Sequence, residues 1–286
     1  MIPYHHIAQR LFNTPLALAP SKAEAIVSVL RGRFGIEALF DANGQVMAFS
    51  DPDYDGDTVP AKGYDIIHGL GVIPVSGTLV QKSGNLRPYC GMTGYDGIRA
   101  NLSMALDDET VKAIALDIDS PGGEVAGCFD LVDAIYKGRG QKPIWAILTE
   151  CAYSAAYAIA SSCDKIVVPR TGGTGSVGVI SMHTEFSRML DKSGVTVTLI
   201  KYGARKAEGN EVQPLSDEAL ARFQADVDKI GEMFVDTVAR NRQLSAAKVR
   251  STEAGTFLGA DGVRVGFADA VMAPDEAFAS LLAELG

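Results

Sequence analysis

The sequence predicts an α/β protein whose sheet is mainly parallel. Strand-like and helix-like segments alternate from residue 64 onward, and such alternation implies parallel pairing through right-handed crossovers. An apolar run, residues 144–148, leads into the small residues 155–161, as expected for a buried strand followed by a tightly packed helix. A long amphipathic segment covers residues 217–242. With 286 residues, 47% of them hydrophobic, the chain can bury a substantial core.

Charge and cysteine usage narrow the range of partners. The formal net charge is −9 and no lysine and arginine cluster stands out, so we expect neither nucleic acid nor an anionic membrane as a partner. The first residues lack the apolar core of a signal peptide, and no long uninterrupted apolar window follows, which predicts a cytoplasmic protein without a membrane anchor. The cysteines show no C-x-x-C spacing or paired histidine, so we expect reduced thiols and no metal site: Cys90, Cys128, Cys151 and Cys163.

The chain divides into three predicted parts. Residues 1–64 are expected to form an N-terminal extension, with a helix over residues 22–30 capped by Ser21, a hairpin turning at Asn43-Gly44, and an acidic linker over residues 51–63. Residues 65–274 form the main domain, and residues 275–286 a C-terminal helix.

Within the main domain, turn residues and hydrophobic periodicity predict the elements in order. Strands are expected at residues 66–80, 111–117, 144–148, 165–168, 177–181 and 195–200. Helices are expected at residues 95–106, 125–137, 155–161 and 185–192, with a mobile loop at 81–94. After the long helix come a shorter helix behind Ser245 and a turn, helix and strand over residues 257–271.

The long helix is predicted to begin after Ser216, a good N-cap residue, with two acidic residues in its first turn. Its apolar positions recur at steps of three or four: Leu220, Phe223, Val227, Ile230, Phe234 and Val238. Such a helix is about 39 Å long, which is more than one small sheet needs as a cover. Part of its apolar face is therefore expected to contact a neighbouring subunit.

Ser154 stands at the junction of the strand and the small-residue helix. One interpretation is that its side chain merely caps the helix. The other is that its hydroxyl is a nucleophile, because free N–H groups at a helix N-terminus can stabilise the oxyanion of acyl transfer. This stretch alone does not separate the two.

Three further stretches bear on that choice: IALDIDSPGG at 114–123, TGSVGV at 174–179 and IKYGARKAEGN at 200–210. Together with the Ser154 stretch, in this order, they resemble the signal peptide peptidase A (protease IV) family of serine peptidases, over about residues 66–273. The resemblance implies a ClpP/crotonase-like fold of repeated β-β-α units. It is strongest to the phage head-maturation branch, through HHIAQRLFNTPLALAPSKAEAI at 5–26, ARKAEGN at 204–210 and VARNRQLS at 238–245.

The resemblance also implies roles for single residues. Ser154 would be the nucleophile and Lys206 its general base, in preference to Lys201 or Arg205, which fit the pattern less well. Because lysine is protonated in water at neutral pH, such a base needs a desolvated surrounding. Ser176 would orient the lysine, although it is also a plausible turn serine. Backbone N–H groups of Gly122, Gly123 and Ala155 would form the oxyanion hole, although Pro-Gly-Gly would equally serve a plain turn. No metal or cofactor is expected.

The function expected from the resemblance is cleavage of scaffold, portal or capsid proteins during prohead assembly. The protein would be a homo-oligomer in the host cytoplasm, within the prohead or in the virion. Two alternatives stay open: a non-catalytic minor capsid protein, and a crotonase-like acyl-CoA enzyme that would share the fold and the oxyanion glycines.

Three other patterns suggest different chemistry. Glycines at 173, 175 and 178 spell G-x-G-x-x-G, but the following residues lack a helical pattern, which argues against nucleotide binding. His183 allows a Ser-His-Asp triad, although a Ser-Lys pair already accounts for the motifs. Cys151 has no base placed by any motif and is expected to be a small buried residue.

Overall fold

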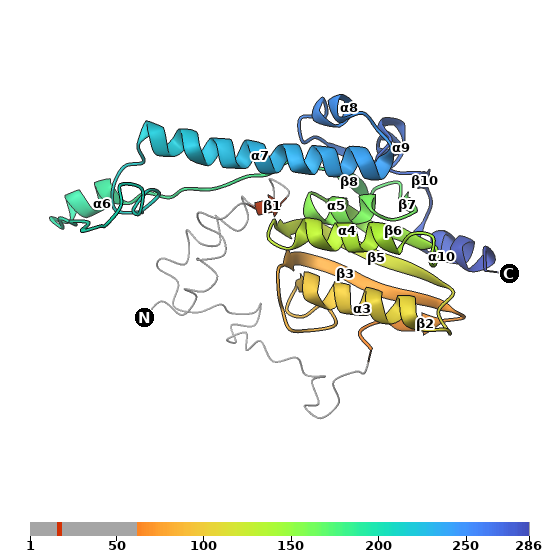
Figure 1. The fold of residues 1–286 in the computed structure, drawn as a ribbon. Helices are drawn as coiled ribbons and strands as arrows, with labels where there is room; N and C mark the ends of the chain where they lie inside the picture. Colours follow the sequence, from red (N-terminus) through yellow and green to blue (C-terminus); the bar gives the residue numbers. More distant parts are fainter. Residues whose placement is uncertain (1–15, 19–61, 286) are drawn as a thin grey trace, which may run out of the picture.

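A computed structural model describes residues 16–18 and 62–285 of the chain. The helix expected at 22–30 and the hairpin at Asn43-Gly44 lie outside the described residues, as does nearly all of the linker. In the described part, helices and strands alternate around one mixed sheet (Figure 1). The predicted α/β class with mostly parallel pairing is confirmed.

The central path of the sheet has the order β10-β7-β6-β5-β3-β2, and β1, β4, β8 and β9 pair beside it. Its strands are β1 (Leu16–Leu18), β2 (Asp65–Ile67), β3 (Leu70–Val80), β4 (Met92–Gly94), β5 (Ala113–Glu124), β6 (Ile144–Tyr153), β7 (Lys165–Val168), β8 (Gly173–Gly175), β9 (Thr256–Leu258) and β10 (Ala270–Val271). All pairs along the path from β3 to β10 are parallel, whereas β1, β2 and β9 pair antiparallel with their neighbours.

The helices are α3 (Tyr95–Asp107), α4 (Cys128–Gly138), α5 (Ala155–Ser161), α6 (Ser187–Lys192), α7 (Asp217–Arg242), α8 (Ala246–Arg250), α9 (Gly259–Val265) and α10 (Pro274–Ala283). Among the described residues, no helix combines the length and apolar character needed to cross a membrane. The long helix has the predicted bounds, and the Ser216 hydroxyl accepts the Ala219 N–H at its start.

The central strands are buried on both faces. Along β5, Ile114, Leu116 and Ile118 belong to the larger core, whereas the alternate residues Ala113 and Ala115 belong to a smaller one. Helices α3, α4, α5 and α7 contribute to the larger core, and α10 covers the smaller one. This explains why the strands read as continuous apolar runs in the sequence.

Several predicted boundaries were wrong, each because pairing partners far away in the sequence decided them. The strand expected at 66–80 is a hairpin, since β2 turns back onto β3 through His68 and Gly69, both at positive φ. The strand expected to end at residue 117 continues through the Pro-Gly-Gly sequence as β5, because β1 and β3 pair with its end. The following helix therefore begins at Cys128, three residues later than expected.

No strand forms at residues 177–181 or 195–200, and the short strand β8 lies at Gly173–Gly175 instead. Residues 187–216, which we call the arm, comprise α6 and the connection to α7. Figure 1 shows the arm at the far end of α7, away from the sheet. Without a neighbouring strand, the apolar residues at 195–200 have no sheet to join.

Phe234→Ala is expected to lower the free energy of unfolding by about 3–5 kcal/mol, because it removes a large, fully buried ring. That ring packs edge-on against Phe129, with ring centroids 5.6 Å apart. Leu220→Ala in the same helix is the control, since Leu220 is 54% exposed and its loss should change stability by about 0.5 kcal/mol or less. Urea denaturation measures both. Equal losses would contradict the assignment of the core to the C-terminal half of α7.

Candidate active site

Ser154 is held in a strained backbone conformation where β6 passes into α5. Its φ is 54° and its ψ is −120°. These angles belong to the first central residue of a type II′ turn, a position that glycine normally fills. For a residue with a Cβ the strain is of order 1–3 kcal/mol and persists only where the surroundings enforce it.

Hydrogen bonds on both sides enforce this conformation. The Ser154 N–H donates to the Gly175 carbonyl at 2.9 Å, and the Ser154 carbonyl accepts the Ala158 N–H at 2.9 Å. The hydroxyl donates to the Gly178 carbonyl at 3.4 Å and makes no capping bond to α5. The interpretation of Ser154 as an N-cap side chain is therefore wrong. Its side chain is fully buried.

The helix behind Ser154 is fully buried over all seven residues, Ala155–Ser161. Its small side chains allow close packing against the sheet, and Tyr157 anchors it by donating a hydrogen bond to the Phe267 carbonyl at 3.0 Å. Ala155, an expected oxyanion donor, is the first residue of this helix. Its N–H therefore belongs to the helix N-terminus, where no carbonyl of the same helix can accept it.

Ser176 lies beside Ser154 because β8 pairs in parallel with β6, with Gly175 opposite Tyr153. Ser176 has a φ of 57° and is almost fully buried. Its N–H donates to the Gly255 carbonyl at 2.9 Å, and its carbonyl accepts the Gly178 N–H at 3.0 Å. The structure thus brings these two serines together on adjacent strand ends.

Gly122 and Gly123 lie close to Ser154, because Ser120 of the same strand pairs with Ala152 of β6. Gly122 has a φ of 102°. Its N–H donates to the Ser120 hydroxyl at 3.1 Å, and that hydroxyl donates to the Gly77 carbonyl at 2.7 Å. A Cβ on Gly123 would lie 1.8 Å from the Leu79 carbonyl oxygen, so only glycine fits there.

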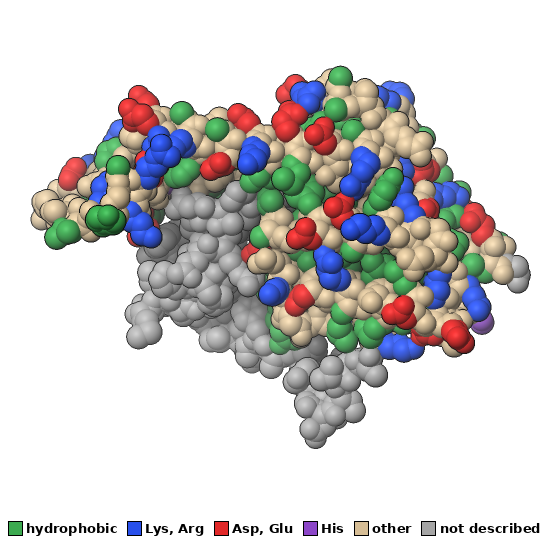
Figure 2. Space-filling model, in the orientation of Figure 1, with side chains coloured by type: hydrophobic (Ala, Val, Ile, Leu, Met, Phe, Trp, Pro, Cys, Tyr) green, Lys and Arg blue, Asp and Glu red, His purple; other side chains and the backbone are tan. Residues whose placement is uncertain are grey.

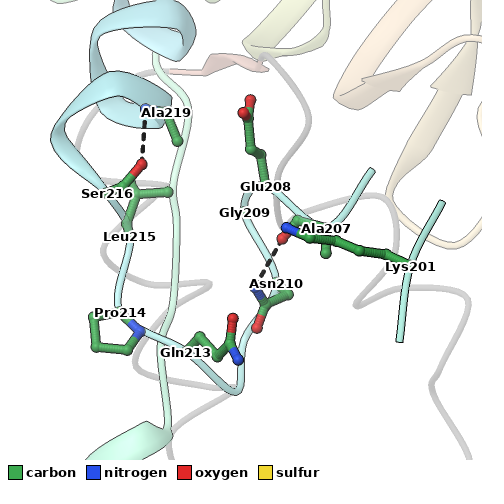
Figure 3. A pocket seen from close by; sticks show the side chains of 10 residues that line it. All are labelled: Lys201, Ala207, Glu208, Gly209, Asn210, Gln213, Pro214, Leu215, Ser216 and Ala219. Carbon is green, nitrogen blue, oxygen red and sulfur yellow. Dashed lines mark hydrogen bonds between the residues drawn. The ribbon is translucent and has the colours of Figure 1, made fainter. Parts of the chain in front are cut away.

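Lys206 does not lie at this site within one chain. It belongs to the arm, its side chain is exposed, and its N–H donates to the Gly203 carbonyl at 3.2 Å. Figure 3 shows the residues that follow it, folded against the start of α7 around a small pocket. Arg222 of α7 holds this turn by a two-bond ion pair with Glu208, with Nε 2.9 Å from Oε2.

The other candidate nucleophile and base are less well supported. Burial, followed by the neighbouring Asp119 carboxylate, raises the pKa of the Cys151 thiol to about 12, so Cys151 is protonated at neutral pH. The Ser154 hydroxyl donates to a carbonyl rather than to His183. Within the described residues, no group of histidine, cysteine and carboxylate side chains could hold a metal ion.

The residues that support the site were not predicted from the sequence. The Ser120 hydroxyl ties Gly122 and Gly77 together, and the Gly178 carbonyl accepts a hydrogen bond from the Ser154 hydroxyl. Both lie inside stretches that had already been singled out, IALDIDSPGG and TGSVGV. The available signal in the sequence was Ser120, a polar residue close to the motif glycines Gly122 and Gly123. The Glu208–Arg222 pair had no local signal, because its members are separated in sequence and meet only when the arm folds.

The model of peptidase family S49 matches residues 137–286, just over half of the chain and the part that contains Ser154, Ser176 and Lys206. The chain belongs to peptidase family S49. This membership confirms the serine-peptidase class and the ClpP-like fold that the motifs indicated.

Curated S49 relatives point to the same branch. The chain is 40% identical to the head-tail preconnector protein GP5 of Enterobacteria phage P21, over 98% of this chain and 57% of that protein. It is 39% identical to the capsid assembly protease C of Escherichia phage lambda, over 92% of this chain and 62% of that protein. A putative signal peptide peptidase SppA of Enterococcus faecium is 29% identical over 66% of this chain and 56% of that protein. The chain spans about three fifths of the length of the two phage relatives.

The Ser154→Gly variant is expected to be more stable than Ser154→Ala, with a free energy of unfolding about 1–2 kcal/mol higher. The reason is that only glycine adopts these backbone angles without strain. Both variants lack the hydroxyl, so the comparison isolates the backbone. Urea denaturation of the two proteins measures the difference. If the glycine variant is the less stable one, as the greater flexibility of its unfolded chain alone predicts, the strained turn is refuted.

Proposed function

We propose that this S49 member is a serine endopeptidase with Ser154 as nucleophile and Lys206 as general base. The observation that carries the proposal is the strained conformation of Ser154. A serine in a position suited to glycine, between a parallel strand and a buried helix, matches a nucleophile held on a sharp turn. A capping or purely structural serine would not require this strain.

The proposed reaction follows from the groups around Ser154. Lys206 accepts the hydroxyl proton while Oγ attacks the peptide carbonyl, and then delivers that proton to the departing amine. Water hydrolyses the acyl-enzyme in the second half of the reaction. The N–H groups of Gly122, Gly123 and Ala155 are the proposed oxyanion donors, each worth about 3–4 kcal/mol. Gly122 must first give up its bond to Ser120, so Gly123 and Ala155 carry most of this role.

Ser176 is the proposed partner that orients the Lys206 amine. Its position beside Ser154 on a paired strand end supports this role. A lysine base also has to be desolvated so that it can lose its proton near neutral pH. Ser154 and Ser176 are buried, whereas Lys206 is exposed within a single copy.

We infer that a neighbouring copy supplies Lys206. The arm carries exposed apolar side chains: Met189, Val195, Val197, Ile200 and Tyr202. Hydrophobic surface is visible at this end of the molecule in Figure 2. Such a surface favours burial against another protein. If the arm of one copy docks over Ser154 of the next, a single contact buries these residues and desolvates the lysine. Head-to-tail docking of this kind forms a ring when the rotation between successive copies closes.

The proposed substrates are proteins of the phage prohead: scaffold, portal or capsid proteins. The names of the two phage relatives, a capsid assembly protease and a head-tail preconnector protein, support this choice. The proposed place of action is the host cytoplasm and the assembling prohead.

Mixing two inactive variants tests the shared dyad. Ser154→Ala and Lys206→Met are each expected to be inactive, as is Lys206→Arg, because guanidinium stays protonated. Coexpressed in equal amounts, the alanine and methionine variants should recover about a quarter of wild-type peptide hydrolysis, the fraction of interfaces with both residues intact. Lys201→Met, in the same arm, should stay active. Mixed oligomers without activity would rule out a dyad shared between copies.

The arm surface is tested by the double substitution Ile200→Asp and Tyr202→Asp. Both side chains are almost completely exposed, at 98% and 99%, so each subunit should fold as before. Light scattering should give the mass of a single chain, and hydrolysis should be lost. Ile67→Asp, at a 49% exposed position on the sheet edge, is the control and should leave the oligomer intact. An unchanged mass for the double variant would refute docking through the arm.

A further inference from the structure

The last residues of β5 can pair with a strand on each of their two sides, and both sides are occupied in the structure. β3 pairs with one edge as far as Gly123. β6 pairs with the other edge up to Ser120, which lies opposite Ala152. β6 then leaves the sheet at Ser154 and enters α5. The last residues of β5 therefore keep an edge that β6 has vacated, immediately beside the candidate nucleophile.

β1 lies on this vacated edge. It pairs antiparallel with the last three residues of β5, and its own last residue, Leu18, lies opposite Gly122. Since β3 already pairs with Gly122 from the other side, β1 must lie on the side of β6. Antiparallel pairing makes β1 run toward Ser120, and thus toward the point where β6 ends at Ser154.

We propose that Leu16–Leu18 occupies the strand position in which a peptide substrate binds, so that the chain's own N-terminal segment keeps the site closed. The inference rests on the proposed peptidase function. An extended peptide adds to an open sheet edge through main-chain hydrogen bonds, and this one leads to the nucleophile. One edge accepts one strand at a time, so β1 competes with every substrate strand.

The burial of Ser154 agrees with a closed site. Its side chain has no exposed surface, and its hydroxyl donates to the Gly178 carbonyl. A substrate carbonyl has to come within about 3–3.5 Å of Oγ before attack. With Ser154 enclosed, a second peptide does not reach that position in this conformation.

The segment is suited to reversible binding. It contributes three paired residues, and the flanking Pro15 and Pro20 lack the N–H that would lengthen the ladder. A tethered segment acts at an effective concentration on the order of millimolar. It therefore excludes dilute peptides and yields to a substrate that is concentrated beside the enzyme.

Kinetics of the full-length chain test the competition. Successive N–H groups of a strand point to opposite edges, so the double substitution Ala17→Pro and Leu18→Pro removes any donor toward β5 from this pair. The apparent KM for a peptide substrate should fall about tenfold with kcat unchanged, as for loss of a competitive inhibitor. Ala17→Ser with Leu18→Met keeps both N–H groups and should keep the wild-type KM. An unchanged or higher KM in the proline variant would overturn the proposal.

Binding in an inactive background separates this inference from the proposed function. Two inactive proteins are compared: Ser154→Ala alone, and Ser154→Ala combined with Ala17→Pro and Leu18→Pro. A labelled peptide of residues 12–22, FNTPLALAPSK, should bind the first protein about tenfold more weakly than the second. Hydrogen exchange at Gly122–Glu124, the residues with which β1 pairs, should be slow in the first protein and fast in the second. Equal peptide affinity, or fast exchange in both, overturns the occupied edge. If the wild-type protein were inactive, the proposed peptidase function would be refuted. The peptide-binding and hydrogen-exchange results would still test whether β1 occupies the edge of β5, because neither requires catalysis.

Discussion

The backbone of Ser154 is the constraint around which the site is organised. β6 passes into α5 through this single residue. Its unusual angles are held by the hydrogen bond that its N–H donates to the Gly175 carbonyl and by the one that its carbonyl accepts from the Ala158 N–H. The same turn sends the chain out of the sheet, which vacates the edge of β5 and leaves room for a peptide strand. The strained turn at this one residue thus sets both the position of the proposed nucleophile and the vacated edge of β5 beside it.

The glycines opposite this turn serve the sheet as well as the chemistry. Gly123 has to be glycine because the Leu79 carbonyl leaves no room for a Cβ, whatever the catalytic role of its N–H. Gly122 is bonded to Ser120, which in turn bonds Gly77. Parallel pairing with β3 therefore positions the two glycines whose N–H groups are proposed oxyanion donors.

The two halves of the proposed dyad have opposite surroundings. Ser154 is fully buried, whereas Lys206 lies on an arm that carries exposed apolar residues. Assembly would join them, and it would make activity depend on concentration. An N-terminal strand across the substrate edge would add a second control. A peptidase that acts among folded assembly partners benefits from both, because neither a lone subunit nor an occupied site can cleave.

The sequence by itself determined the elements that local interactions define. The bounds of α7 follow from its Ser216 cap and its helical periodicity, and the position of Ser154 between strand and helix follows from the change in pattern at that residue. Only the tertiary structure decided the backbone angles of Ser154, the continuation of β5 through Pro-Gly-Gly and the separation of Lys206 from Ser154. Each of these depends on hydrogen bonds or contacts between distant segments, which leave no periodic signal in the chain.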